Sequence, residues 1–348
     1  MTRSYTVNVA GQSLEVVGDG ATERFRPAFS RVEVAGTGAA DAVLHLETVA
    51  DLYDVAEPLE VGLNRGAEGS FAVLRTAPPM IEVFHPHQAR GTGGPRLRVM
   101  ASPEALDAGD VLAQPAHVAI AAWLATQGGF LMHAAGVAID GRGILLIGAG
   151  GRGKTTTALA AVQRGFSYLG DDLCILRPDP SGQGGHQLHG LYATAKLNPD
   201  TRARLGLTAW TGLGATPKGK VVAAIPATIG FASVVPLAVI VHVGQSTHGE
   251  TEAARLTRRE AFRQLGTASG PMLLAAGPSG GWLAAMARIA RDVPVFSLAI
   301  DWNLDRVVAA LAVIASAGAN GCGGDDDGMA MVPDVKFTGV AKQRPDVL

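Results

Sequence analysis

The 348-residue sequence lacks the features of several large protein classes. It has only two cysteines, Cys174 and Cys322, which form no metal-type pair and favour a reducing compartment, the cytoplasm. No uninterrupted apolar run reaches the roughly 18 residues that a membrane span needs, so we expect no membrane partner. The first residues lack a basic start followed by an apolar stretch, and we therefore expect no signal peptide.

Charge is also scarce. Asp, Glu, Lys and Arg make up 17% of the residues and the formal net charge is −2, which argues against a nucleic-acid partner. By contrast, 47% of the residues are hydrophobic and 45 are glycines. This composition indicates a compact folded protein, long enough for a large core and about two domains.

One glycine-rich segment matches a specific motif. Residues 148–155 read Gly-Ala-Gly-Gly-Arg-Gly-Lys-Thr, which fits G-x-x-x-x-G-K-[ST], the phosphate-binding P-loop. In this motif backbone N–H groups wrap the phosphate, Lys154 can reach the β- and γ-phosphates, and the Thr155 hydroxyl can bind Mg²⁺. A predicted buried strand at 143–147 precedes the motif, and a predicted helix at 156–164 follows it. The alternative is a glycine-rich turn with an incidental lysine.

If the motif is a P-loop, its residues and the one after it contact ATP. The expected contacts are Gly148, Gly150, Gly151, Arg152, Gly153, Lys154, Thr155 and Thr156.

Two adjacent carboxylates, Asp171 and Asp172, end a predicted strand at 166–172. Phosphoryl transfer needs a phosphate cradle, a metal and a group that positions or deprotonates the acceptor. Strand ends at the carboxyl edge of a parallel α/β sheet converge on the ligand crevice. One carboxylate can therefore help to hold Mg²⁺, and the other can accept a proton from a hydroxyl. The alternative is a solvated turn.

Two further residues are candidates through their position. His133 precedes a predicted hairpin around Asp140–Gly141, and it lies near the mouth of the site if that hairpin folds back. The alternative is that His133 is a buried histidine of the core with no role in the site. Lys220 follows Pro217 in a Pro/Gly turn and is a candidate contact for phosphate or acceptor. Its alternative is a solvated surface lysine.

The chain divides into three predicted regions. Residues 1–112 form a β-rich N-terminal domain, residues 113–317 the P-loop catalytic domain, and residues 318–348 a flexible Gly- and Asp-rich tail. The N-terminal strands are predicted at 5–9, 14–17, 31–34 and 71–74. A single helix is predicted over 111–128, and a mobile loop over 178–190.

The order and spacing of these motifs resemble the catalytic domain of HPr kinase/phosphorylase. The resemblance runs from Phe130 to Leu176. It comprises a His-Ala-Ala-Gly-Val segment, an Asp-Gly turn, the P-loop, an Arg-Gly pair and Gly-Asp-Asp. It implies an α/β fold whose P-loop kinase core is similar to HPr kinase and phosphoenolpyruvate carboxykinase. It also implies a homo-oligomer.

The resemblance assigns roles to the candidate residues. Lys154 and Thr155 would hold the nucleotide and Mg²⁺. Asp171 would be the base that activates the acceptor hydroxyl, and Asp172 would assist with the metal. His133 would line the catalytic pocket.

A narrower resemblance concerns the acceptor. Residues 195–197 (Ala-Lys-Leu) and 218–220 (Lys-Gly-Lys) resemble a lysine-bearing segment of HPr-kinase-like proteins encoded with ribosomal peptide clusters, including lasso-peptide kinases. We therefore expect an ATP- and Mg²⁺-dependent kinase that acts on a hydroxyl, a serine of a peptide or small protein. Two alternatives stay open: a small-metabolite kinase, and a nucleotide-binding regulatory module without transfer activity.

Overall fold

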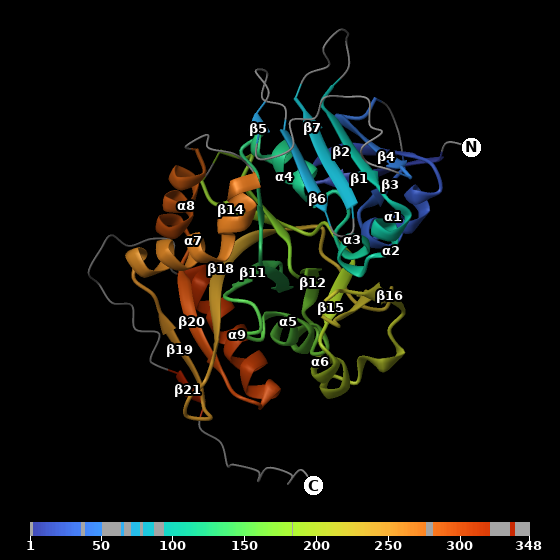
Figure 1. Cartoon of the computed structure of the whole chain (residues 1–348). Helices are drawn as coiled ribbons and strands as arrows, with labels where there is room; N and C mark the ends of the chain where they lie inside the picture. Colours follow the sequence, from blue (N-terminus) through green and yellow to red (C-terminus); the bar gives the residue numbers. More distant parts are fainter. Residues whose placement is uncertain are drawn as a thin grey trace.

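The computed structural model has a mixed α/β architecture (Figure 1). It describes residues 3–35, 39–50, 64–65, 71–76, 79–86, 94–182, 184–275, 281–320 and 335–337. Within these residues the strands form three sheets. The predicted α/β class is present, but the sheet that carries the glycine-rich loop is mixed, where a parallel sheet was expected.

An eight-stranded sheet forms the N-terminal part, in the order β3-β1-β2-β4-β8-β7-β6-β5. Its strands are β1 (Arg3–Val9), β2 (Gln12–Gly18), β3 (Glu33–Val34), β4 (Ala42–Thr48), β5 (Asn64–Arg65), β6 (Phe71–Thr76), β7 (Pro79–His85) and β8 (Arg96–Ala101). Alternate residues such as Val7, Val9, Leu14 and Val16 are buried with helix α1 (Ala21–Phe29). Three of the four strands predicted here are confirmed, and of the one predicted at 31–34 only Glu33–Val34 is a strand, because Arg31 and Val32 lie in a turn.

The single helix predicted over 111–128 is wrong. Two short helices, α3 (Gly109–Ala113) and α4 (His117–Ala125), occupy this region, and a third short helix, α2 (Pro103–Asp107), precedes them. The chain breaks at Pro115, because proline lacks an N–H group and disfavours helical backbone in the residue before it. Gln114 accordingly adopts φ −145° and ψ 64°, and Ala116 adopts φ 56°. Helix α4 then contacts both the N-terminal sheet and the second sheet.

The second sheet has the order β12-β10-β11-β18-β14-β13-β9, and β20, β19 and β21 extend it beside β18. Its strands are β9 (Phe130–Met132), β10 (Ala135–Ile139), β11 (Arg142–Ile147), β12 (Ser167–Gly170), β13 (Cys174–Pro178), β14 (His186–His189), β18 (Val234–Gln245), β19 (Thr251–Arg255), β20 (Val295–Ile300) and β21 (Val335–Phe337). The predicted hairpin joins β10 and β11.

Two of these strands lie in segments that were predicted to be a mobile loop and a flexible tail. Strand β14 occupies the end of the predicted mobile loop, because its buried Leu188 and His189 pair between β13 and β18. Strand β21 lies within the predicted tail and pairs with β19. The tail residues 321–334 and 338–348 lie outside the described residues.

Helices cover both faces of the second sheet (Figure 1). They are α5 (Lys154–Val162) and α9 (Leu304–Asn320) on one face, and α7 (Arg258–Ala275) and α8 (Gly281–Asp292) on the other. Along β11, Ile144 and Leu146 belong to the α5/α9 core, whereas Leu145 and Ile147 belong to the α7/α8 core. A strand buried on both faces needs an unbroken apolar run, as this strand has.

A small third sheet has the order β15-β17-β16. Its elements are β15 (Thr194–Leu197), β16 (Gly212–Ala215) and β17 (Val221–Ala224), with α6 (Pro199–Arg204) and the 3-10 helix η2 (Leu207–Ala209) between β15 and β16. Among the helices in the described part of the chain, none has both the length and the apolar character for crossing a bilayer.

Candidate active site

Three segments meet at one edge of the second sheet. Strand β11 ends at Ile147 and enters the glycine-rich loop, and β12 ends at Gly170, just before Asp171. Strand β10 starts at Ala135, just after His133. Because β10 is antiparallel to both β11 and β12, its start lies at the same edge as their ends. The topology therefore brings together the loop, the aspartates and the histidine.

Two glycines of the loop, Gly148 and Gly153, pass too close to neighbouring strands for a side chain. Gly148 has φ 140°, and a Cβ there would lie 2.7 Å from the Val243 carbonyl oxygen. Gly153 has φ 102°, and a Cβ there would collide with the Ile300 side chain. The loop is thus packed against β18 and β20 where it enters α5. The free N–H groups and dipole at the α5 N-terminus favour an anion.

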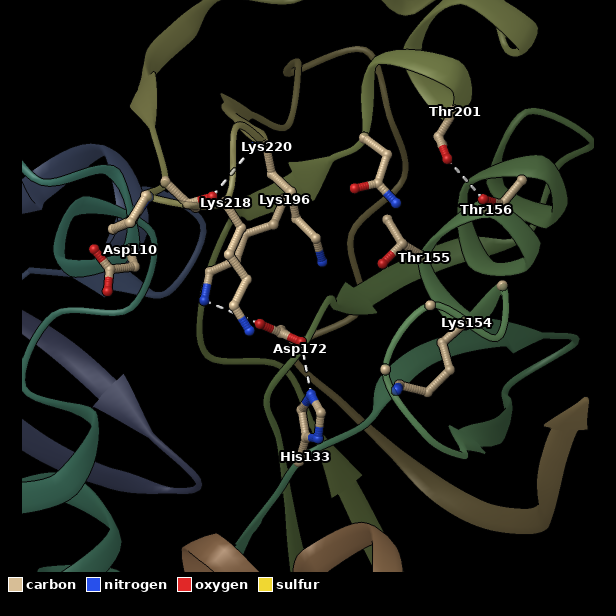
Figure 2. A pocket seen from close by; sticks show the side chains of 16 residues that line it. Asp110, His133, Lys154, Thr155, Thr156, Asp172, Lys196, Thr201, Lys218 and Lys220 are labelled. Carbon is tan, nitrogen blue, oxygen red and sulfur yellow. Dashed lines mark hydrogen bonds and ion pairs between the residues drawn. The ribbon is translucent and has the colours of Figure 1, made fainter.

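A pocket of about 420 Å³ opens in front of the loop (Figure 2). The predicted residues that line it are His133, Gly150, Gly151, Gly153, Lys154, Thr155, Thr156, Asp172 and Lys220. Gly148 instead accepts a hydrogen bond from Lys154 Nζ at 2.7 Å, so the lysine lies back over the loop. Arg152 is exposed and outside the lining, and Asp171 is buried beneath it.

Asp171 is only 3% exposed and both of its carboxylate oxygens accept hydrogen bonds. The Thr155 hydroxyl donates to Oδ1 at 2.7 Å, and the backbone N–H of Lys196 donates to Oδ2 at 2.9 Å. Burial raises the pKa of Asp171, and the negative charge of Asp172 raises it further, against these two hydrogen bonds. Asp171 is therefore joined to the start of α5 rather than to the open pocket.

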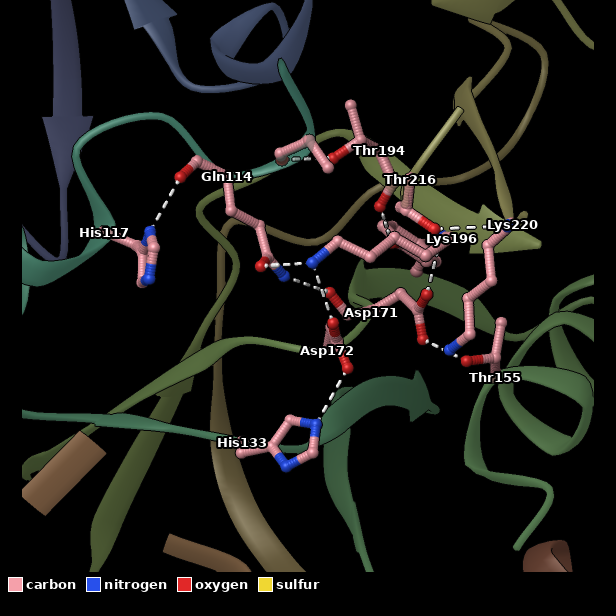
Figure 3. A network of polar contacts seen from close by, with 12 residues as sticks. Gln114, His117, His133, Thr155, Asp171, Asp172, Thr194, Lys196, Thr216 and Lys220 are labelled. Carbon is pink, nitrogen blue, oxygen red and sulfur yellow. Dashed lines mark hydrogen bonds and ion pairs between the residues drawn. The ribbon is translucent and has the colours of Figure 1, made fainter. Parts of the chain in front are cut away.

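Asp172 faces the pocket from a strained backbone position, with φ 69° (Figure 3). Its Oδ1 lies 2.8 Å from His133 Nε2, and its Oδ2 accepts a hydrogen bond from Lys196 Nζ at 2.9 Å. Burial alone would raise the pKa of Asp172. The hydrogen bond to His133 and the charge of Lys196 outweigh burial and hold this pKa far below its usual value. Asp172 is thus ionised, and His133 Nε2 is the donor.

Gln114 belongs to the site although the sequence analysis did not select it. Its Oε1 accepts a hydrogen bond from Lys196 Nζ at 2.7 Å, and its Nε2 donates to the Asp171 carbonyl oxygen at 3.4 Å (Figure 3). The break at Pro115 places it there, and the Tyr192 hydroxyl donates to the Pro115 carbonyl at 2.8 Å. The Gln-Pro pair inside an apolar run was the available signal, since a helix usually ends before a proline.

Lysine is rare in this chain, and most of it lies in the pocket. The sequence has six lysines among 29 basic residues. Four of the six line the pocket: Lys154, Lys196, Lys218 and Lys220. Among the lining residues, the carboxylates are Asp110 and Asp172. The lining therefore has an excess of positive charge, which suits an anionic ligand.

The oxygen atoms at the start of α5 suit Mg²⁺, which prefers oxygen ligands and keeps several waters. Thr155 and Asp171 supply a hydroxyl and a carboxylate that already contact each other. In the described part of the chain, no cluster of three or more His, Cys, Asp or Glu residues is placed to hold a metal ion alone. These donors therefore fit a metal whose other ligands are phosphate oxygens and water.

Comparison with known proteins gives a distant likeness to solved structures. No family model matches the sequence, and no curated protein matches it. Among solved structures, the chain is similar to the HPr(Ser) kinase/phosphatase from Coxiella burnetii, with 14% identity and a TM-score of 0.29. The match covers 55% of this chain and 99% of that one. Because this structural relationship is distant, the function has to be argued from the site itself.

Proposed function

We propose that this chain is an ATP- and Mg²⁺-dependent kinase that transfers the γ-phosphoryl group to a hydroxyl, that of a serine in a peptide or small protein. The observation that carries the proposal is one pocket that unites Lys154, Thr155 and the ionised Asp172. Phosphoryl transfer is catalysed mainly by positioning and by electrostatic stabilisation, and these residue types supply both.

The nucleotide side of the pocket is the glycine-rich loop. Its backbone N–H groups and the α5 N-terminus would hold the phosphates, with Lys154 as the nearest cation. Thr155 and Asp171 would hold Mg²⁺ directly or through water. When bound, Mg²⁺ supplies positive charge that offsets the negative charge of the transferred group.

The acceptor side centres on Asp172. A general base must first reach the hydroxyl, and only then does its pKa matter. Both aspartates have both oxygens engaged, but Asp172 lines the pocket whereas Asp171 is buried beneath it, so we assign proton transfer to Asp172 and the metal side to Asp171. This exchanges the roles that the family resemblance implies.

The test is transfer of label from γ-labelled ATP with Mg²⁺ to serine-containing peptides, free serine and sugars. We expect label in peptides and none after EDTA is added. Label in free serine or sugars alone would favour the small-metabolite kinase. Nucleotide binding with no transfer to any acceptor would favour the regulatory module. Absence of nucleotide binding would contradict the site itself.

A further inference from the structure

The turn between β16 and β17, residues 216–220, carries two lysines into the pocket, Lys218 and Lys220. Three hydrogen bonds close this turn. The Thr216 N–H donates to the Lys220 carbonyl at 2.8 Å, the Gly219 N–H to the Thr216 carbonyl at 2.9 Å, and the Lys220 N–H to the Thr216 hydroxyl at 3.2 Å. Both lysines are therefore presented by a closed turn with a defined backbone.

Neither lysine of the turn forms an ion pair within the described part of the chain. In this they differ from Lys196, which is bonded to Asp172 and Gln114. The two close views show the Lys220 side chain pointing into the pocket, toward the side where Thr155 lies (Figures 2 and 3). An ammonium group that lines a pocket without a carboxylate partner is suited to an anionic ligand.

Lys220 lines the same pocket as the lysine of the loop. Lys154 comes from the start of α5 and Lys220 from the 216–220 turn, so the two ammonium groups approach the pocket from different elements (Figure 2). Two ammonium groups on opposite sides of a pocket repel each other, and an anion between them removes this cost. Lys154 and Lys220 are thus suited to hold one phosphate group from two sides.

The choice of residue type supports the same conclusion. This chain uses lysine at six of its 29 basic positions, and two of those six lie in this one turn. Lysine presents a compact point charge on a flexible stem, whereas arginine presents a wide planar fork. A compact charge suits a phosphoryl group that moves between two oxygen atoms.

We propose that Lys220 is a catalytic residue that contacts the transferred phosphoryl group from the side opposite Lys154. This inference rests on the proposed kinase function and adds a residue to it. The bond between the γ-phosphorus and the β–γ bridging oxygen breaks, the acceptor oxygen bonds to that phosphorus, and the hydroxyl proton passes to Asp172. ADP leaves with the bridging oxygen. Lys220 exchanges no proton and stabilises negative charge on the non-bridging oxygens.

The decisive variant is Lys220→Met, which removes the charge and keeps the length of the side chain. The matched control is Arg255→Ala, which removes one positive charge from an exposed residue of β19 outside the pocket lining. For each protein we would measure phosphoryl transfer from Mg·ATP to the best peptide acceptor. We would also measure affinity for Mg·ADP and for Mg·ADP with aluminium fluoride, which imitates the transferred group.

We expect Lys220→Met to lower the maximal rate about 100-fold and to weaken binding of the aluminium fluoride complex, with Mg·ADP affinity changed less than about twofold. Arg255→Ala should match the native protein in all three. A native rate in Lys220→Met, or equal weakening of both complexes, would overturn the inference. If circular dichroism shows that Lys220→Met is not folded, the same measurements on Lys220→Gln test the inference. A native protein without transfer activity would instead defeat the proposed function.

Discussion

The pocket has two walls of different origin. The loop wall, residues 148–156, is one continuous stretch that passes from β11 into α5. The lysine wall, Lys196, Lys218 and Lys220, comes from β15 and the 216–220 turn, and Gln114 at the α3–α4 break bonds to Lys196 from outside the lining. The loop wall is contiguous in sequence, although it packs against β18 and β20, whereas the lysine wall joins segments that are distant in sequence. If the proposed function holds, the residues for phosphate come from one stretch of sequence, whereas the arrangement of the acceptor side depends on the whole fold.

The N-terminal sheet supports the lysine wall. Glu82 of β7 is only 2% exposed, and its Oε2 accepts hydrogen bonds from the backbone N–H groups of Val118 and Ala119, at 2.8 and 3.0 Å. These are free donors at the start of α4, and a carboxylate there is favoured by the helix dipole. The carboxylate therefore fixes the helix that follows the break at Gln114, and so links the two sheets to the site.

The largest expected effect comes from breaking the loop wall. Lys154→Ala removes the cation nearest the β- and γ-phosphates, so we expect phosphoryl transfer to fall at least about 1,000-fold. Transfer of label from ATP measures this, with Arg255→Ala as the charge-matched control. A Lys154→Ala protein that keeps a tenth of the native rate would show that the loop wall does not bind the phosphates.

The second-largest effect on the rate is expected from replacing the two aspartates, Asp171 and Asp172. Asp172→Asn should lower the rate about 100- to 10,000-fold at every Mg²⁺ concentration, because it removes the proton acceptor. Asp171→Asn should instead raise the Mg²⁺ concentration needed for half-maximal rate, so that excess Mg²⁺ restores much of the activity. Magnesium titrations of both variants measure this. The reverse pattern would indicate that Asp171, and not Asp172, is the general base.

The sequence predicted the loop wall better than the lysine wall, for physical reasons. The strand at 143–147 is confirmed, and the helix predicted from 156 begins two residues earlier, at Lys154. These elements follow from local patterns of apolar residues and glycine. The position of Gln114 depends on a helix break and on pairing between distant strands, which no local pattern contains. Likewise, the opposite environments of Asp171 and Asp172 arise from partners 16 to 39 positions away in sequence.

A smaller effect is expected from loosening the lysine wall alone. Gln114→Leu removes the hydrogen bond to Lys196 Nζ, so we expect about a tenfold lower rate with unchanged ATP affinity. Gln264→Leu, on α7 outside the pocket lining, is the matched control. Measuring kcat and the Kd for nucleotide distinguishes an effect on the lysine wall from an effect on the loop wall. A weaker ATP affinity with native kcat would place Gln114 on the nucleotide side instead.

The smallest effect on activity is expected at His189, which belongs to the sheet rather than to either wall. Burial and, to a smaller extent, the charge of Arg177 together lower its pKa from 6.5 to about 4. The unfolded chain therefore takes up this proton at a higher pH than the folded chain. The contribution of His189 to stability is full above pH 6.5, falls as the pH drops toward 4, and is level below that.

The loss across this interval is at most about 3 kcal/mol in the free energy of unfolding. Denaturant unfolding from pH 7 to pH 4 measures it. His189→Gln should show a flatter dependence on pH, with a native rate of transfer at neutral pH. An identical slope in the two proteins would mean that His189 is not the group responsible.

The most direct measurement is a crystal structure of the protein with Mg²⁺ and a non-hydrolysable ATP analogue. The account predicts phosphates along residues 148–156, Mg²⁺ beside Thr155 and Asp171, and the terminal phosphate between Lys154 and Lys220 with Asp172 facing it. A nucleotide bound elsewhere, or one whose terminal phosphate points away from both aspartates, would contradict the account.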